Sequence, residues 1–148
     1  MKPKVLFNSI AFKQAFENLK DINNLNDVLV FYDEECYFKD PFHNLNSKKH
    51  IRKLFVNMFQ TVNNPRFTDL KMLSDGSIIV LSWTFVFARK GEKIQSCIKG
   101  SSWIQVNEKG YISHHHDYWD SVELFQTFKL LRIPLQFIKT IFSRAQAR

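Results

Sequence analysis

The sequence predicts an α+β domain in which helices lie across one face of a curved antiparallel sheet. Three observations lead to this prediction. Apolar residues recur at helical spacing between residues 9 and 59, and they alternate at strand spacing between residues 66 and 120. Turn residues separate the alternating segments. A chain of 148 residues is long enough for one such domain with a substantial core.

Three helices are expected first. Ser9 is predicted to cap the first helix. Asn23 or Asn24 opens the second, and Asn46 or Ser47 caps the third. The expected inward residues recur at helical spacing and are Ile10, Phe12, Ala15, Phe16 and Leu19, then Leu25, Val28, Leu29 and Tyr32, then Ile51, Leu54, Phe55, Met58 and Phe59.

A short strand, residues 36–39, is expected between the second and third helices. It ends at Asp40, because Pro41 holds the preceding residue in an extended conformation. Longer strands follow the third helix, separated by turns at Asp75-Gly76, Lys90-Gly91 and residues 107–110. They are predicted at residues 66–73, at 78–88 as a central strand with both faces covered, at 94–106 with a break or bulge near Gly100, and at 110–120.

The last predicted strand carries most of the titratable side chains. Because successive strand residues point to opposite faces, its side chains divide into two rows. The first row is Ser113, His115, Asp117 and Trp119, and the second is Ile112, His114, His116 and Tyr118. A titratable row beside a tryptophan is typical of a cavity wall. His114 and His116 could supply half of a metal site, but no third ligand is evident, so no metal is expected.

The C-terminal segment differs from the rest of the chain. Its apolar residues predict two amphipathic helices separated near Pro134, which suits the first turn of the second helix. The flanking charges are basic, against a single Glu123. Two interpretations stay open: the helix closes the domain or contacts a second copy, or it is attracted to an anionic membrane.

Composition narrows the function classes. The net charge is +7, but the basic residues are spread out, so nucleic-acid binding is not expected. Cys36 and Cys97 lack metal-ligand spacing, and reduced thiols are the simplest interpretation. The start of the chain does not resemble a cleavable leader, and no run of about twenty apolar residues could span a membrane. We therefore expect a soluble, cytoplasmic protein.

Two segments resemble a known family. Residues 32–42, Tyr-Asp-Glu-Glu-Cys-Tyr-Phe-Lys-Asp-Pro-Phe, are similar to the Y-x-x-D-x-x-x-x-D-P stretch of ketosteroid isomerases. Residues 110–120 are similar to the G-x-I-x-x-H-x-D-x-W ending of SnoaL-like proteins. The chain is thereby identified over residues 8–125 as a member of the SnoaL-like branch of the nuclear transport factor 2-like superfamily, with residues 126–148 as a basic amphipathic extension.

The resemblance implies a cone-shaped domain, a cystatin-like roll, whose sheet wraps a hydrophobic pocket roofed by helices. It places Asp40 at the position of the isomerase base, and Phe16 and Ser102 at or near the positions of the isomerase hydrogen-bond donors. In SnoaL-type polyketide cyclases the acid/base aspartate lies in the region matched by His115 and Asp117. The implied catalytic residues are Asp40, His115 and Asp117, and the implied ligand-binding residues are Phe16, Tyr32, Phe55, Trp83, Ser102 and Trp119.

These features support two functional hypotheses. The first is a cofactor-free isomerase, cyclase or dehydratase that moves protons on a small hydrophobic carbonyl compound. The second is a non-catalytic module that binds a small molecule, a lipid or a protein partner; a homodimer is expected in either case. Structural alternatives also stay open: Asp40 as a turn cap, His115 and Asp117 as a buried structural pair, and Trp119 as a core residue.

Overall fold

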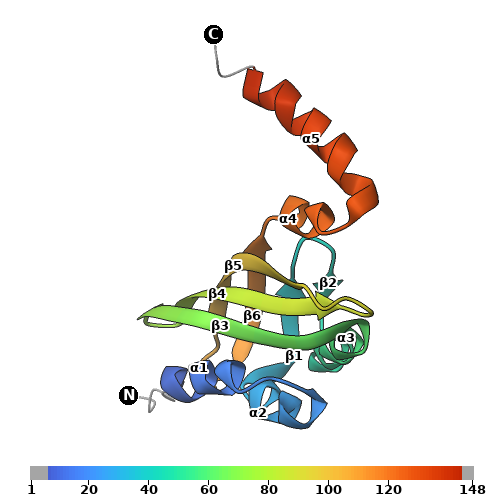
Figure 1. Cartoon of the computed structure of the whole chain (residues 1–148). Coiled ribbons are helices and arrows are strands. Elements are labelled where there is room, and N and C mark those ends of the chain that lie inside the picture. The colour runs from blue at the N-terminus through green and yellow to red at the C-terminus, as the bar shows by residue number, and fades with distance from the viewer. Residues whose placement is uncertain (1–6, 145–148) are drawn as a thin grey trace.

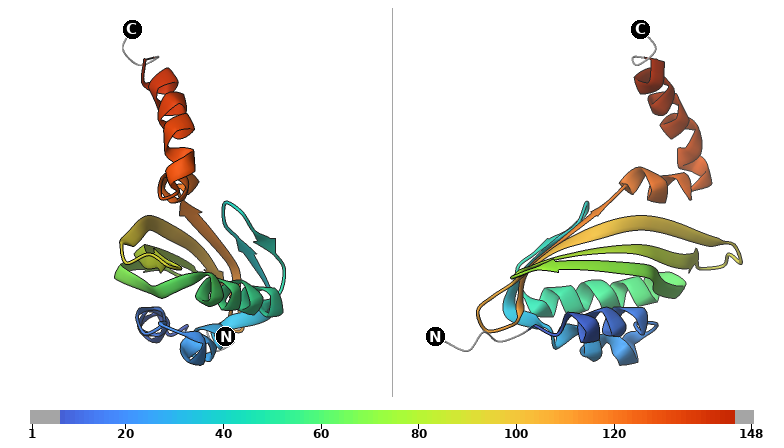
Figure 2. Two further views of the ribbon diagram at one scale, coloured as in Figure 1. Left: turned by 45° about the vertical axis from the view of Figure 1, so that its right-hand side comes forward. Right: turned by 90° about the vertical axis from the view of Figure 1, so that its left-hand side faces the viewer.

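The computed structural model describes residues 7–144, which form one curved six-stranded sheet with helices packed against its concave face (Figures 1 and 2). The predicted α+β class is confirmed. The elements in chain order are α1 (Ser9–Glu17), the short 3-10 helix η1 (Ile22–Asn24), α2 (Leu25–Leu29), β1 (Tyr32–Lys39), β2 (Asn44–Leu45), α3 (Lys48–Thr61), β3 (Val62–Asp75), β4 (Ile78–Arg89), β5 (Gln95–Val106), β6 (Ile112–Trp119), α4 (Ser121–Gln126) and α5 (Lys129–Arg144).

The strand order across the sheet is β2-β1-β6-β5-β4-β3. Neighbouring strands are antiparallel except for β1 and β6, which run parallel. The pairing of β1 with β6 is the longest-range strand contact in the sheet. It brings the residues just before Asp40 and Pro41 beside the histidines of β6. Phe38, for example, is the register partner of His115.

Side-chain caps begin α1 and α3. Two positions differ from expectation, the cap of α1 and the placement of Tyr32. Asn8, not Ser9, caps α1, because its side chain accepts a hydrogen bond from the backbone N–H of Ala11 at 3.0 Å. Ser47 caps α3, as predicted. Tyr32 was expected on a helix but begins β1, because pairing with Ile112 of β6 draws it into the sheet.

The strand β3 is longer than expected because it continues through two irregularities. The pairing with β4 shifts register between residues 63 and 66 and again between residues 68 and 71. Asn64 and Asp69 lie at these shifts with positive φ, a conformation that Asn and Asp tolerate better than most residues. The strand β4 is interior as expected, but its outer face is only half-buried, because helices cover the concave face alone.

Two expectations for the last strands are corrected: the break or bulge near Gly100, and the strict alternation of residues 112–119. At Gly100, β5 pairs regularly with both neighbours. The irregularity lies in β6 instead, where Val106 pairs with Ile112 and Gln105 with His114. Ser113 is therefore bulged out of the alternation, and Ile112 is completely buried, although strict alternation had placed it on the opposite face from His115.

The C-terminal helices also differ from expectation. The break between them falls at residues 127–128, where Thr127 ends α4 by donating its hydroxyl to the carbonyl of Leu124. Pro134 lies inside α5 rather than in its first turn. The helix α5 projects away from the sheet (Figures 1 and 2). Within the described residues, no helix combines the length and the apolar character needed to cross a bilayer.

Gly100 provides room for a tryptophan. A Cβ atom at Gly100 would lie 2.4 Å from the ring of Trp83, its register partner on β4. We therefore expect Gly100→Ala to displace Trp83 and to lower the free energy of unfolding by about 1–3 kcal/mol, as overpacking does. Urea denaturation followed by fluorescence measures the loss. Ser101→Ala, on the opposite face of β5, is the control, and equal stability of the two variants would contradict the packing argument.

The two cysteines predict different reactivity. Cys36 is buried, and burial raises the pKa of its thiol from 9.0 to about 11, so its thiolate fraction at neutral pH falls about a hundredfold. Cys97 is exposed. Iodoacetamide at pH 8 should therefore label Cys97 in the folded protein and Cys36 only after denaturation, as read by mass spectrometry. Labelling of both thiols at similar rates in the folded chain would contradict the burial of Cys36.

Candidate functional site

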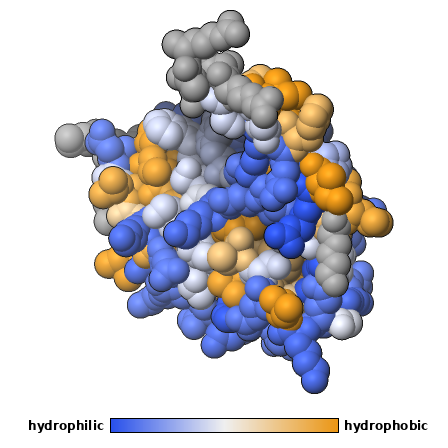
Figure 3. All heavy atoms as spheres, turned by 45° about the horizontal axis from the view of Figure 1, so that its top comes forward, coloured by the Kyte–Doolittle hydropathy of each residue, from blue (hydrophilic) through white to orange (hydrophobic). Residues whose placement is uncertain are grey.

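A cavity of about 550 Å³ lies between the concave face of the sheet and helices α1, α3 and α4. This volume falls within the range of roughly 300–1,000 Å³ that is usual for small-molecule sites. Figure 3, viewed toward the side from which α5 projects, shows apolar side chains inside a rim of hydrophilic ones. The lining is mostly apolar and includes Phe16, Phe38, Phe42, Leu54, Phe55, Met58, Phe67, Leu70, Leu81, Trp83, Phe85, Phe87, Ile98, Trp119, Leu124 and Phe128.

The register of the two last strands concentrates polar groups on one wall of this cavity. Ser102 pairs with Asp117, and Ile104 pairs with His115. Side chains at paired positions and at every second residue share a face, so Ser102, His115 and Asp117 all point to the concave side. The expected inward row of β6 is confirmed for His115, Asp117 and Trp119, which all line the cavity.

These polar groups form one hydrogen-bonded cluster. The indole N–H of Trp83 donates to Ser102 Oγ at 2.9 Å, and the Ser102 hydroxyl donates to Asp117 Oδ1 at 2.5 Å. His115 Nε2 lies 2.7 Å from the same carboxylate oxygen. Asp117 Oδ1 is thus held from two directions, by a hydroxyl and by an imidazole.

Tyr32 completes the cluster behind His115. Its hydroxyl lies 2.6 Å from His115 Nδ1, its ring stacks on the imidazole, and its side chain is entirely buried. Burial raises the pKa of the Tyr32 hydroxyl well above its ordinary value, and the charge of Asp117 raises it further, so the hydroxyl keeps its proton. Within the described residues, His115 Nδ1 is the one acceptor within reach of this hydroxyl, so Tyr32 donates to Nδ1 and His115 donates from Nε2 to the carboxylate. Every group of this buried cluster then has a partner.

This arrangement separates the roles of His115 and Asp117. Both nitrogens of His115 are used, and only 3% of its side chain is exposed. The Asp117 side chain is 18% exposed. Within the described residues, the hydrogen bonds to Asp117 reach Oδ1, so Oδ2 is the oxygen that a molecule in the cavity can approach. The geometry therefore leaves Asp117, rather than His115, as the group of this pair that a ligand can reach.

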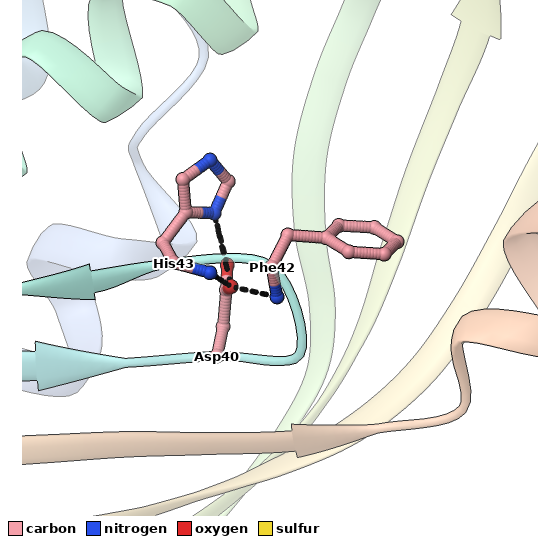
Figure 4. Close-up of polar contacts among 3 residues, drawn as sticks. All are labelled: Asp40, Phe42 and His43. Carbon is pink, nitrogen blue, oxygen red and sulfur yellow. Dashed lines mark hydrogen bonds and ion pairs between the residues drawn. The ribbon is translucent and has the colours of Figure 1, made fainter.

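Asp40 has a structural task at the turn between β1 and β2 (Figure 4). Its Oδ1 accepts the backbone N–H groups of Phe42 at 2.7 Å and His43 at 2.6 Å, and it lies 2.9 Å from His43 Nδ1. Asp40 and His43 also line the cavity. The three contacts favour the interpretation of Asp40 as a turn cap, because its carboxylate is already occupied by donors from its own loop.

Five of the six residues expected to bind a ligand line the cavity: Phe16, Phe55, Trp83, Ser102 and Trp119. Tyr32 does not, because it lies behind His115. The sequence analysis missed His43, Phe42 and Phe128 as lining residues. Of these three, only His43 could have been selected from the sequence, because it lies three residues after Asp40 of the Asp-Pro pair.

Apart from Ile112, which the bulge turns into the core, the second row of β6 faces outward. His114 and Tyr118 are exposed, and the rings of His116 and Tyr118 stack with centroids 4.0 Å apart. Across residues 7–144, no three His, Cys, Asp or Glu side chains gather in a way that could hold a metal ion.

Comparisons with known proteins agree with this architecture. The sequence model of a family described as "SnoaL-like domain" matches residues 13–115. A comparison with curated proteins gives no match. Among solved structures, similarity extends to an NTF2-like protein from Burkholderia thailandensis, with TM-score 0.68, 11% identity and coverage of 79% of this chain and 91% of that one.

Two further structures are similar. One is a protein from Pseudomonas putida provisionally named a polyketide cyclase, with TM-score 0.64, 13% identity and coverage of 78% of this chain and 90% of that chain. The other, from Catenulispora acidiphila, is described as having a ketosteroid isomerase-like fold and was solved with trimethylamine, with TM-score 0.65, 12% identity and coverage of 78% and 87%. At these identities the likeness establishes the fold.

The contact between Tyr32 and His115 can be tested by removing one oxygen. Tyr32→Phe keeps the stacked ring but leaves the buried His115 Nδ1 without its donor. We expect the free energy of unfolding to fall by about 1–3 kcal/mol, the cost of an unsatisfied buried group. Thermal or urea denaturation measures this change. Tyr111→Phe, at an exposed tyrosine, is the matched control, and a Tyr32→Phe variant as stable as this control would contradict the hydrogen bond.

Proposed function

The chain belongs to the SnoaL-like domain family, and from this premise we propose that it is an acid–base enzyme of the isomerase or cyclase kind. Its substrate would be a small hydrophobic carbonyl compound. One observation carries the proposal: a carboxylate, Asp117, is held by Ser102 and His115 at the wall of an apolar cavity, with one oxygen left for a ligand. The fold alone permits many activities, so the argument rests on this cluster.

The proposed reaction moves one proton between carbon atoms. Asp117 Oδ2 removes a proton from the carbon next to the substrate carbonyl, and the electron pair of the broken C–H bond forms an enolate. The protonated carboxyl group then returns the proton to a different carbon. In the cyclising version, the enolate carbon attacks a second carbonyl within the same molecule, and the carboxyl group gives its proton to the alkoxide that forms. Fixed hydrogen bonds to Oδ1 keep the carboxylate oriented throughout, which is the condition for general base catalysis.

An enolate oxygen needs a hydrogen-bond donor near it. At the positions where the ketosteroid isomerase resemblance places donors, this chain has Phe16, which donates nothing, and Ser102, whose hydroxyl is directed to Asp117. Asn57 of α3 also lines the cavity and carries an amide NH₂ group. We assign the donor role to Asn57, so that the substrate carbonyl would be directed toward α3.

A second function remains open because of the cavity lining. Seventeen of the twenty-five lining residues are apolar, and hydrophobic contact alone can hold an apolar ligand in such a cavity. In this alternative, the chain binds a small apolar molecule without turnover, and the polar cluster of Asp117 and its partners specifies the orientation of the ligand. The absence of a donor at Phe16 favours this alternative over authentic steroid isomerisation.

Proton abstraction can be measured without knowing the product. Deuterium incorporation next to the carbonyl of a panel of ketones and enones in D₂O is followed by proton NMR. We expect exchange with the wild-type chain, and a loss of about 10²–10⁴-fold in Asp117→Asn, the usual contribution of a general base. Asp27→Asn, at an exposed carboxylate of α2, is the control. Because Asp40 is assigned to the turn, Asp40→Asn should retain most of the exchange.

The same panel separates the two functions. Ligand binding is followed by the fluorescence of Trp83 and Trp119, which line the cavity, in the wild type and in Asp117→Asn. Binding without exchange in the wild-type chain would favour the non-catalytic alternative. Exchange that is equal in the wild type and in Asp117→Asn would contradict the role assigned to this carboxylate.

A further inference from the structure

The helix α5 exposes an apolar face to solvent. It extends away from the sheet and the other helices (Figures 1 and 2). Leu130 is 93% exposed, Ile133 79% and Phe142 72%. Four more large apolar side chains of this helix are exposed: Leu131, Phe137, Ile138 and Ile141. A contiguous apolar surface of this kind marks a site of interaction.

The exposed apolar residues occupy one side of α5. At 100° per residue, the apolar positions of α5 span an arc of about 200°. The polar positions Arg132, Gln136, Lys139, Thr140 and Ser143 fall together on the remaining side. An arc this wide exceeds the narrow seam of a coiled coil, which is confined to two positions in seven. The width of the apolar face therefore suits an extended apolar surface better than a single partner helix.

The charge of this segment is entirely of one sign. Residues 129–148 contain five Lys or Arg residues and no Asp or Glu, so they carry most of the chain's net charge of +7. Two copies of the helix packed through their apolar faces would leave these basic residues on the outer sides, with no acidic partner on either helix. An anionic lipid surface matches both properties, because its acyl region accepts the apolar face and its headgroups attract the cations.

We propose that α5 is an interfacial helix that lies on an anionic membrane surface. Its 16 residues, about 24 Å in length, lie in the plane of the bilayer, with Phe137 and Ile141 in the acyl boundary and Arg132 and Lys139 among the headgroups. This docking does not depend on the proposed reaction. A second copy of the helix, packed through the same apolar face, is the competing occupant, and the experiment distinguishes it from a membrane.

Docking would also bring the cavity close to the lipid. Leu124 of α4 and Phe128, immediately before α5, both line the cavity. The guanidinium of Arg89 lies 4.9 Å from the ring centroid of Phe128 and fixes this side of the opening. A ligand dissolved in the bilayer would thus meet the cavity at the side that α5 attaches. The entry of a ligand from the bilayer rests on the proposed function of the cavity, whereas the docking of α5 does not.

The test uses the full chain and sedimented vesicles. Vesicles of phosphatidylcholine mixed with phosphatidylglycerol are compared with vesicles of phosphatidylcholine alone, at low and high salt. We expect the protein to sediment with the anionic vesicles and to be released by salt. Arg132→Gln and Lys139→Gln should each weaken binding about fivefold, the usual effect of one surface cation near an anionic membrane.

The apolar face is tested by a double variant, Phe137→Ser with Ile141→Ser. It should weaken binding to anionic vesicles at least about tenfold, because two large side chains no longer enter the lipid. Leu73→Ser, at a leucine that is 78% exposed on β3, is the matched control and should bind as the wild type does. Circular dichroism of each variant verifies that the helix content is retained.

Two results would overturn the proposal. One is equal, negligible sedimentation of the wild type with both kinds of vesicle. The other is a concentration-dependent dimer in analytical ultracentrifugation that the double variant abolishes while vesicle binding is absent, which would assign the face to a second copy. Neither result bears on proton exchange by Asp117, so the docking and the proposed function fail separately.

Discussion

The site depends on the need to satisfy a buried imidazole. His115 is almost completely enclosed, so water cannot serve its two nitrogens, and both must have fixed partners. Tyr32 supplies a hydroxyl to one, and Asp117 accepts from the other. Because the O–H of Tyr32 has no other acceptor among the described residues, it donates to Nδ1, and this sets the direction of both hydrogen bonds. One oxygen of Asp117 is thereby fixed, and Asp117 itself lines the cavity.

The sheet geometry makes this cluster possible. The bulge at Ser113 lets Ile112 enter the core while His115 and Asp117 still face the cavity, which strict alternation would forbid. Gly100 leaves space for the ring of Trp83, whose indole N–H then orients Ser102 toward the carboxylate. Two backbone features thus position a chain of side-chain hydrogen bonds that begins in the core and ends at an apolar cavity.

The fold class and the inward row of β6 could be predicted from the sequence, because period and turn residues are local signals. Other features could not be predicted, since they depend on contacts distant in the chain. The parallel pairing that draws Tyr32 into a strand joins residues eighty positions apart. For Asp40 the sequence left two roles open, a catalytic one by resemblance and a turn cap, and the hydrogen bonds that favour the turn cap are visible only in three dimensions. Pro134 suggested a helix start, but α5 continues through it.

The most direct test of the cluster is the protonation of the His115 imidazole. Two-bond proton–nitrogen correlation NMR of the full chain at neutral pH distinguishes the two ring nitrogens and reports which of them carries the proton. The account predicts a neutral ring protonated at Nε2, with Nδ1 accepting the hydroxyl proton of Tyr32. A proton on Nδ1, or a ring that exchanges freely with solvent, would mean that Asp117 is not held as described, and the proposed base would lose its support.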